Sequence, residues 1–396
     1  MIFKMDATHG PGMGLPSRRS VLRKGVGLGL GASLLATRRG TLYAASSGPM
    51  APEPRKTRIR FPGDAGAHPE FATEWWYVTG YAGDGNLEAA YGFQVTFFRS
   101  RVAQTQALQS RLAAKQLLFA HAAVTDVKGK RLWSDQRIAR WSGLPPSANS
   151  TDIAFASERD TGVAIRDWSL QRSGNDLHAR IRASNFSLDL TFAQTQGVLL
   201  QGDDGFSRKG PQSSEFSYYY SLPQLRTSGV LTLNAKSLAI GNGGANTATA
   251  WLDHEWSNTL LDDDATGWDW IGINLFDQSA LTAFQLRDKH GNAFWDGGSF
   301  RSGENQFTFH PGEVTFKPLR TWRSPLTKAI YPVEWLVRTP ADFYTVRAMI
   351  DNQELDSTNS TGAIYWEGLC EVWDSNQQKV GRGYLEMTGY AAPLKL

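Results

Sequence analysis

The chain has 396 residues, with 41 Lys and Arg, 38 Asp and Glu, and a formal net charge of +3. Its first 45 residues hold seven of the basic residues and one acid, so the remainder has 34 basic and 37 acidic residues, a net charge of −3. A mildly acidic chain without a run of Lys or Arg lacks the electrostatic footprint of nucleic-acid binding, so we expect no nucleic-acid partner. The single cysteine, Cys370, excludes an intramolecular disulfide.

The N-terminal segment is typical of an exported protein. Arg18 and Arg19 precede a weakly apolar, glycine-rich run over residues 25–36, and small residues follow at Ala44 and Ala45. This is the layout of a twin-arginine secretion signal, with cleavage expected after one of the two alanines. A disordered basic N-terminus is the alternative interpretation.

We therefore expect a signal peptide over residues 1–45, a linker over 46–60, and a mature protein that is periplasmic or secreted. The apolar run of the leader is shorter than the about 20 residues that a transmembrane helix needs. No later stretch reaches that length, so the mature chain is expected to have no transmembrane span.

Beyond the leader, short apolar and aromatic runs recur between Gly, Asn and Asp turn signals, and helical periodicity is almost absent. This pattern predicts an all-β protein. Many antiparallel strands at short intervals favour closed barrels or sandwiches. The predicted strands are residues 75–81, 87–98, 117–126, 162–172, 176–183, 186–192, 229–233, 247–252, 268–276, 280–287, 312–317, 333–339, 343–350, 365–373 and 381–387.

The length that remains after the leader is enough for two ordinary domains. The turn-rich segment 211–226 is the predicted boundary, which gives an N-terminal domain at 61–225 and a C-terminal domain at 226–396. One segment departs from the strand pattern: residues 103–116 are rich in Ala, Gln and Leu. We predict a short surface helix there, with a loop over a barrel mouth as the alternative.

The first candidate site is the run Glu74-Trp75-Trp76-Tyr77. Strand alternation sends Glu74 and Trp76 to one face and the other two residues to the opposite face. Because small barrels fill their interior with side chains, we interpret Trp76 as a structural plug, with ligand contact as the alternative. Glu74 is either a paired carboxylate or part of a binding site.

The second candidate site, Asp253-His254-Glu255-Trp256, is predicted to lie at a strand end. If the strand continues, Asp253 and Glu255 share one face, and His254 and Trp256 share the other. Burial against tryptophan raises the pKa of a carboxyl group and keeps a proton available near neutral pH. The alternative is a buried salt bridge at a strand end, because such pairs also perturb pKa values.

Further aromatic and polar residues can extend these sites. Trp268 and Trp270 continue the tryptophan pattern, Tyr219 lies in a run of three tyrosines, and Asp277 follows in the next predicted hairpin. Each ring can either line a pocket or pack in the core.

Several site classes find no support in the sequence. The histidines are scattered without the spacing of zinc ligands, so His254 beside an acid is the most that a metal site could use. No nucleophile elbow, P-loop or dinucleotide fingerprint is present. We therefore expect no metal and no cofactor.

At these residues the chain resembles the AttH-type, lipocalin-like family, which includes the bacterial carotenoid 1,2-hydratases and proteins labelled predicted secreted hydrolases. The resemblance covers nearly all of the mature chain and implies two consecutive lipocalin-like β-barrels. The matching pieces are Glu74-Trp75-Trp76-Tyr77, Phe119-Ala120-His121, Ser217-Tyr218-Tyr219-Tyr220, Asp253-His254-Glu255-Trp256 and Gly383-Tyr384-Leu385-Glu386-Met387-Thr388-Gly389-Tyr390.

The resemblance also implies a chemistry that needs no cofactor. Carotenoid hydratases add water across an isolated terminal double bond, with an acidic side chain to protonate it and aromatic rings to shelter the carbocation. His254 and Trp256 match the family's His-x-Trp element. Its Tyr-x-Asp element has its nearest counterpart at 275–277, where Asp277 is present and the tyrosine is not.

Two functional hypotheses follow. In the first, an exported enzyme hydrates or isomerises an isoprenoid or other hydrophobic substrate. Asp253, His254 and Glu255 would then be the catalytic candidates, with Asp253 as proton donor and His254 orienting it or a water. The remaining candidates, Trp256, Trp268, Trp270, Glu74, Trp76, Tyr219 and Asp277, would bind the substrate.

In the second hypothesis, the barrels carry a lipid or other hydrophobic ligand without chemistry, and an ABC-type transporter is a candidate partner. Lipocalin-like barrels host both kinds of function, so the fold does not choose between them. A single pocket between the two barrels is a third arrangement, compatible with either hypothesis.

Overall fold

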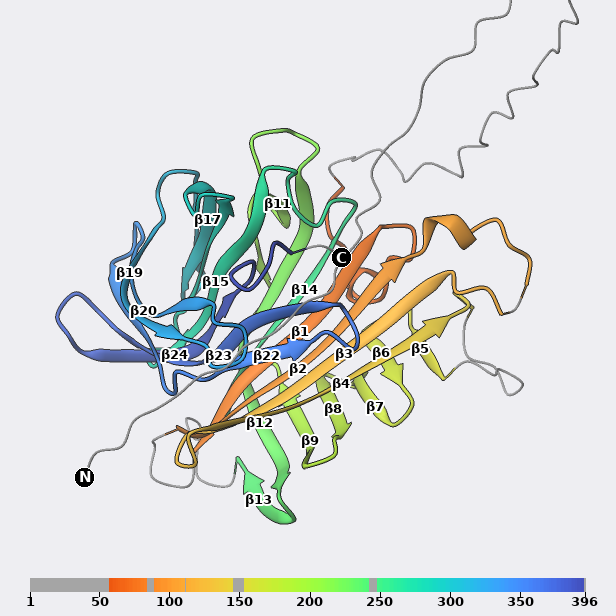
Figure 1. Cartoon of the computed structure of the whole chain (residues 1–396), viewed down its shortest axis with the longest axis horizontal. Helices are drawn as coiled ribbons and strands as arrows, with labels where there is room; N and C mark the ends of the chain where they lie inside the picture. Colours follow the sequence, from red (N-terminus) through yellow and green to blue (C-terminus); the bar gives the residue numbers. More distant parts are fainter. Residues whose placement is uncertain (1–56, 84–88, 111, 145–152, 242–247, 395–396) are drawn as a thin grey trace, which may run out of the picture. The chain divides into compact units, whose positions relative to one another are not determined.

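The structure is a computed structural model that describes five stretches of the chain, residues 57–83, 89–110, 112–144, 153–241 and 248–394. The predicted signal peptide and most of the predicted linker lie outside these stretches. The described chain is all-β, as predicted, and folds into two antiparallel sheets (Figure 1). The helical segments within it are two turns of 3-10 helix, η1 (Gly63–Ala65) and η2 (Ala103–Thr105). None of its helices is long and apolar enough to cross a membrane.

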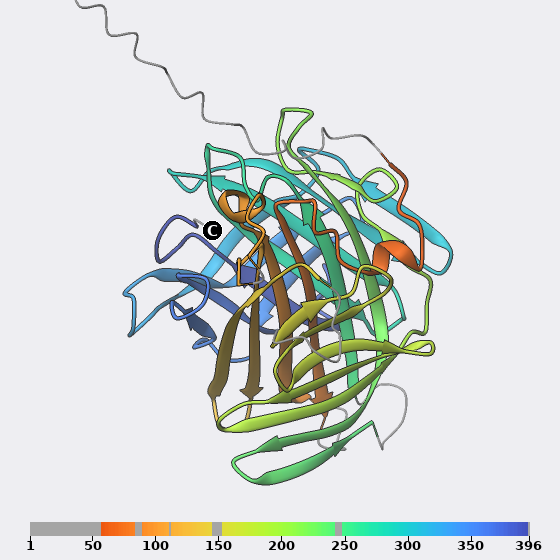
Figure 2. The same ribbon diagram turned by 90° about the vertical axis from the view of Figure 1, so that its right-hand side faces the viewer.

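The first sheet has 14 strands in the order β4-β3-β2-β1-β14-β12-β9-β8-β7-β6-β5, with β10, β11 and β13 paired to β12. The hairpin of β12 and β13 projects at the lower edge of this sheet in Figure 2. The strands are β1 (Thr73–Gly83), β2 (Ala89–Arg101), β3 (Gln116–Asp126), β4 (Arg131–Trp141), β5 (Ala154–Ala156), β6 (Gly162–Ile165), β7 (Trp168–Ser173), β8 (Asp176–Arg182), β9 (Phe186–Ala193), β10 (Leu199–Leu200), β11 (Phe206–Arg208), β12 (Phe216–Leu233), β13 (Lys236–Ile240) and β14 (Ala248–Ser257).

The first sheet curls into a nearly closed barrel. Strands β4 and β6 are far apart in the strand order but lie side by side (Figure 1). The guanidinium of Arg137 on β4 donates to the carbonyl of Ile165 at 3.4 Å and to that of Arg182 at 3.0 Å. These bonds span the gap where the strand ladder is interrupted, and they bring together the two ends of the sheet.

The second sheet has 10 strands in the order β18-β17-β16-β15-β24-β23-β21-β20-β19, with β22 paired to β23. Its strands are β15 (Ala265–Leu275), β16 (Ala280–Asp288), β17 (Ala293–Ser302), β18 (Asn305–Phe309), β19 (Thr315–Arg323), β20 (Ile330–Arg338), β21 (Phe343–Ala348), β22 (Glu354–Ser357), β23 (Ala363–Trp373) and β24 (Lys379–Met387).

The chain passes from the first sheet to the second between β14 and β15. The predicted boundary at 225/226 falls inside β12, an 18-residue strand that pairs with β14 in its first half and with β9 in its second half. The turn-like residues of segment 211–226 are therefore largely part of a strand. Residues 229–233, predicted as a separate strand, are the end of that same long strand.

Two local predictions are corrected by the structure. The described residues of 103–116 form one 3-10 turn at 103–105 and a further turn at 106–107, and Gln116 begins β3, because side chains bond to the backbone there instead of leaving it to a helix. Thr105 Oγ1 donates to the Ala114 carbonyl at 2.6 Å, and Gln106 Nε2 donates to the Lys115 carbonyl at 2.7 Å. The predicted strand 162–172 is two strands, separated by a turn at Arg166, whose φ is 55°.

Side-chain alternation along β1 and β14 divides the apolar residues between two layers. Trp76 on β1 is fully buried in the core of the first barrel. Its neighbour Tyr77 points the other way and packs with Trp251, Trp270 and Tyr384 in a cluster shared by the two sheets. The strands β1, β14 and β12 therefore have one face inside the first barrel and one face against the second sheet.

Candidate active site between the two sheets

The predicted cluster 253–256 lies at the C-terminal end of strand β14, as predicted, and all four residues are part of the strand. Strand β14 continues to Ser257 and pairs with β1 on one side and β12 on the other. Regular alternation therefore holds, and Asp253 and Glu255 face the second sheet. His254 and Trp256 point into the first barrel. The four residues belong to two separate sites on opposite faces of one strand.

A cavity of about 100 Å³ lies between the sheets. Each sheet contributes a row of directly paired residues to its wall, and each row combines aromatic rings with carboxyl groups. The row from β2, β1, β14 and β12 is Phe98, Trp75, Glu255 and Tyr219; the row from β16, β15, β24 and β23 is Phe284, Trp270, Glu386 and Glu367. Further lining residues include Tyr77, Asp253, Lys209, Leu260, Leu261 and Trp268.

Asp253 is held by three hydrogen-bond donors. Its Oδ1 accepts from Ser221 Oγ at 2.5 Å and from Trp251 Nε1 at 2.7 Å, and its Oδ2 accepts from the Tyr219 hydroxyl at 2.9 Å. Burial raises the pKa of Asp253 to about 7, although the three donors act in the opposite direction. Near neutral pH this carboxyl group can therefore either hold or accept a proton.

Glu255 is the cavity acid with a cationic partner. Its carboxylate forms an ion pair with Lys209. The Lys209 ammonium also lies 4.7 Å from the centre of the Trp75 ring, a cation–π distance. This arrangement places one positive charge at the aromatic wall, beside the row from the first sheet.

Glu367 and Glu386 lie opposite each other on β23 and β24. Burial and the charge of Glu386 hold the pKa of Glu367 well above its usual range. Burial also raises the pKa of Glu386 to about 7, and the charges of Asp253 and Glu255 add to this effect. The cavity thus has more carboxyl groups than its one lysine neutralises.

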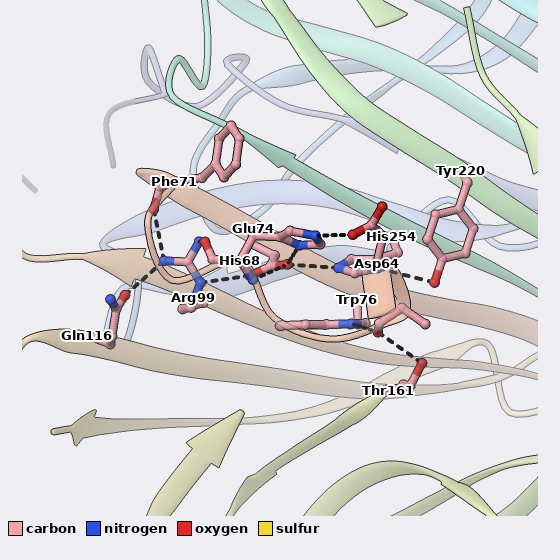
Figure 3. Close-up of polar contacts among 11 residues, drawn as sticks. Asp64, His68, Phe71, Glu74, Trp76, Arg99, Gln116, Thr161, Tyr220 and His254 are labelled. Atoms are coloured by element: carbon pink, nitrogen blue, oxygen red, sulfur yellow. Dashed lines mark hydrogen bonds and ion pairs between the residues drawn. The ribbon is translucent and has the colours of Figure 1, made fainter. Parts of the chain in front are cut away.

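Another buried acid, Glu74 on β1, lies inside the first barrel, on the face of β1 and β14 that points away from the cavity (Figure 3). Its carboxylate accepts from Arg99 Nε at 2.7 Å and from the His68 backbone N–H at 2.9 Å. Ring nitrogens of His68 and His254 lie 2.8 and 2.9 Å from its Oε1. We call these residues, together with Asp64 beside His68, the Glu74 cluster.

Charges in the Glu74 cluster balance one another. Burial would raise the pKa of Glu74, but Arg99 and His68 outweigh it and hold that pKa well below its usual range. Burial would lower the pKa of His68, but Glu74 and Asp64 raise it to about 9. His254 differs, because burial dominates and lowers its pKa to about 4 despite Glu74. The cluster therefore contains a carboxylate, two cations and a neutral histidine, with Asp64 at its edge.

Aromatic stacking fixes the two histidine rings of the cluster. His68 stacks on Trp256 with ring centroids 3.8 Å apart, and His254 stacks on Trp76 at 4.8 Å. The indole N–H of Trp76 donates to the Ala65 carbonyl at 3.4 Å. Both tryptophans thus pack within the barrel core, as the plug interpretation of Trp76 predicts.

His68, Glu74 and His254 are also the one triple in the described residues whose ligand atoms lie close enough for a metal ion, all within 4.8 Å. Glu74 Oε1 is already within hydrogen-bond distance of both histidine rings, and its Oε2 accepts from Arg99. A dication at this place would also lie beside the Arg99 guanidinium. These contacts fit a hydrogen-bonded charge cluster, and we assign no metal there.

The predicted site residues therefore fall into three groups. The cavity contains Asp253, Glu255, Tyr219, Trp268 and Trp270. The barrel interior contains Glu74, Trp76, His254 and Trp256. Asp277 belongs to neither: its Oδ1 caps the turn after β15 by accepting from the Ser279 N–H at 2.9 Å. His254 cannot orient Asp253, because the two side chains point to opposite faces of β14.

Sequence reasoning did not identify His68, Arg99, Lys209, Glu367 and Glu386 as site residues. A signal existed for the two glutamates, because each interrupts an apolar strand: 365–370 reads Tyr-Trp-Glu-Gly-Leu-Cys and 384–387 reads Tyr-Leu-Glu-Met. A carboxyl group in such a run is either paired or functional. His68, Arg99 and Lys209 carried no comparable local signal.

The two sheets, the nearly closed first barrel and the acid-lined aromatic cavity define a lipocalin-like all-β protein. The AttH-like family matches residues 52–390, and the chain belongs to that family. The crystal structure of an AttH protein from Nitrosomonas europaea is similar, with a TM-score of 0.76 and 40% sequence identity over 86% of this chain and 100% of that chain.

Kievitone hydratase from Nectria haematococca is a more distant structural relative. Its TM-score is 0.63 at 16% identity, and the match covers 85% of this chain and 94% of that chain. At this identity the likeness establishes a shared fold. No curated protein matches the chain in sequence.

Proposed function

We propose that this protein is an enzyme that uses acid catalysis to hydrate or isomerise a carbon–carbon double bond in an isoprenoid or another hydrophobic substrate. The observation that carries the proposal is the cavity between the sheets, where protonatable carboxyl groups and aromatic rings occupy the same wall. Membership of the AttH-like family and a fold shared with a hydratase support it.

The reaction requires an acid, a stabilised cation and a base. Protonation of one alkene carbon leaves positive charge on the other, and a water molecule attacks that carbon in a hydration. A desolvated cation–π contact stabilises such a positive charge by about 2 kcal/mol. The rings of Trp75, Trp268 and Trp270 line the cavity and can make such contacts. Carboxyl groups with pKa values near 7 suit general acid–base catalysis, which contributes typically 10²–10⁴-fold.

Cavity size restricts what part of a substrate can enter. A volume of about 100 Å³ is close to the ~150 Å³ of an apolar cavity that binds benzene, and is below the ~300 Å³ of small ligand pockets. Only the reacting end of a long chain, on the scale of one isoprene unit, fits between the acids. The rest of such a substrate would extend past Leu260 and Leu261, in the loop between β14 and β15.

The test begins with the ligand. Native mass spectrometry of the purified full-length protein, followed by solvent extraction, identifies any lipid that accompanies it. Incubation of that lipid, or of a panel of isoprenoid alkenes, in deuterium oxide then detects both reactions, because each attaches a solvent proton to carbon. We expect deuterium in the product. A lipid that binds and returns unlabelled would instead establish a carrier.

We also propose that the protein works in the periplasm or outside the cell. The support is the twin-arginine pattern of Arg18 and Arg19 before an apolar run. Replacing both arginines with lysine should retain the protein in the cytoplasm, as measured by cell fractionation. Unchanged export of that variant would contradict the twin-arginine route.

A further inference from the structure

Glu367 and Glu386 are direct register partners on neighbouring antiparallel strands. Such partners have Cβ atoms about 5 Å apart, so their side chains are immediate neighbours. Both line the cavity. Neither forms an ion pair with a lysine or arginine in the described chain, whereas Glu371, four residues along the same strand from Glu367, pairs with both Lys379 and Arg382.

One oxygen of Glu367 lacks a well-aligned hydrogen-bond partner among the described residues, and Tyr77 is the hydrogen-bonding group beside it. Glu367 is 2% exposed, and its Oε2 accepts from Gln94 Nε2 at 2.6 Å. Its Oε1 is buried without an aligned hydrogen-bond partner among the described residues, and so is the hydroxyl of the neighbouring Tyr77. A poorly satisfied buried polar atom costs free energy, and a catalytic role is one explanation for keeping it. The cavity is the space that this carboxyl group lines.

In a buried site, ionisation of both of two adjacent carboxyl groups is strongly unfavourable unless a cation is close to them. The established outcome for such pairs is one proton shared between two carboxyl groups. The pair titrates as a unit, so its proton belongs to both residues. The raised pKa of each glutamate agrees with this description.

We propose that Glu367 and Glu386 hold one proton between them and deliver it to the double bond of the substrate. This inference rests on the proposed function and assigns its acid. In the reaction, the alkene π electrons form a new C–H bond with the shared proton, and the pair becomes doubly ionised. Water then forms a C–O bond at the cationic carbon, and a second proton leaves that oxygen.

Asp253 is placed to accept the second proton. Its three hydrogen-bond donors stabilise the carboxylate form, which suits a base better than an acid. After product release, the proton on Asp253 returns to the glutamate pair through water, and the site is restored. The same groups allow isomerisation if Asp253 removes a proton from the neighbouring carbon instead.

The local arrangement favours this assignment. Glu386 is flanked on one side by Glu367 and on the other by Trp270, its register partner on β15. The acid and the ring that would face the cation are therefore adjacent in one row. The titratable and charged groups facing the pair are Tyr77 on β1, Tyr365 on β23, Tyr384 on β24, Asp253 and Glu255 on β14, and Lys209 across the cavity.

The shared proton can be tested without any substrate. Infrared spectroscopy of the full-length protein at about pH 8, above the Asp253 pKa of about 7, should show a protonated-carboxyl band that is lost in the double variant Glu367→Gln/Glu386→Gln. The single variant Glu386→Gln should unfold at a higher temperature than the wild type at about pH 9, which is above the Glu386 pKa of about 7, and at a similar temperature at about pH 5. Glu371→Gln is the matched control and should keep the band while losing stability through its lost ion pairs.

Turnover separates this inference from the proposed function. Glu367→Gln and Glu386→Gln should each lower deuterium incorporation by about 100-fold or more. Turnover without a protonated-carboxyl band in the wild type would overturn the glutamate pair as the acid and leave the enzyme intact. A band that behaves as expected, in a protein that labels no alkene, would support the shared proton and count against the enzyme. A destabilised Glu386→Gln at both pH values would identify a structural pair and overturn the inference.

Discussion

Glu74 and His254 lie on one face of β1 and β14, and the cavity lies on the other face, between Asp253 and Glu255 of β14 and Glu367 and Glu386 of the second sheet. The two sites differ in how their charge is balanced. Glu74 is fully buried, yet Arg99 and His68 both contact it, and its pKa is held well below its usual range. Among the described residues, Asp253, Glu367 and Glu386 form no ion pair with a cation, because Lys209 of the cavity pairs with Glu255, and their pKa values are raised. The presence or absence of a cationic partner therefore separates an ionised acid in the barrel from proton-holding acids in the cavity. The first arrangement favours stability, and the second favours proton transfer.

The largest expected effect comes from breaking the charge balance of the Glu74 cluster. Glu74→Gln leaves the fully buried Arg99 and the His68 cation without their carboxylate. Removing one partner of a buried ion pair costs about 3–5 kcal/mol, so we expect a loss of this size in the free energy of unfolding, measured with urea. Glu386→Gln is the comparison from the opposite face and should lose far less. A similar loss of stability in both variants would contradict the claim that Glu74 is a stabilising ion-pair residue and Glu386 is not.

The pH dependence of stability should show two separate windows, because the groups have opposite surroundings. Asp253 and Glu386 have raised pKa values of about 7. Their contribution to the free energy of unfolding is therefore complete below about pH 4 and is lost as the pH rises to about 7. The His68 pKa is raised from 6.5 to about 9, so its contribution is complete below 6.5 and is lost as the pH rises through about 9.

Glu74 has the opposite sign: its lowered pKa contributes stability above about pH 4.5 that is lost as the pH falls. Thermal unfolding across these pH values checks all three contributions. Glu386→Gln should make thermal stability less dependent on pH below pH 7. His68→Gln should do the same above pH 7. A wild-type protein that becomes steadily more stable from pH 5 to 9 would contradict both assignments.

A smaller effect is expected where the cavity has its one ion pair. Lys209→Met removes the partner of Glu255 and the cation beside Trp75 while keeping the apolar stem. Because the Lys209 and Glu255 side chains are 14% and 8% exposed, the variant leaves a mostly buried carboxylate without its partner, and we expect a loss of about 1–3 kcal/mol in unfolding free energy. Isothermal titration calorimetry of Lys209→Met and wild-type protein with an apolar ligand should show that the substitution changes ligand affinity by a larger fraction than it changes stability. A loss as large as that of Glu74→Gln would place Lys209 among the structural ion pairs.

Local alternation was enough to predict the all-β class and the division of Glu74, Trp76, Asp253 and Glu255 between faces. It did not reveal which face belonged to which site. Period-two patterns assign side chains to two faces, but the packing of a second sheet outside the first barrel depends on contacts between distant strands. The cavity joins β14 to β24, and Glu386 lies 131 positions after Glu255 in the chain.

The same limit explains the other differences from prediction. His68 precedes β1 in a segment without strand pattern, and only the fold brings it onto Glu74. The boundary at 225/226 followed turn-forming residues that β12 accommodates with a bulge near Gln224, whose φ is 54°. Local turn signals were overridden there by pairing with β9 and β14.

The most direct test of the central claim measures binding and proton transfer in the same samples. Wild-type protein and Asp253→Asn are incubated with isoprenoid alkenes in deuterium oxide, and both ligand affinity and carbon-bound deuterium in the recovered alcohol and alkene are determined. The account predicts deuterium on carbon for the wild type, and a variant that binds similarly but labels about 100-fold more slowly or less. Tight binding with no label in the wild-type sample would contradict an acid-catalysing enzyme and identify a carrier.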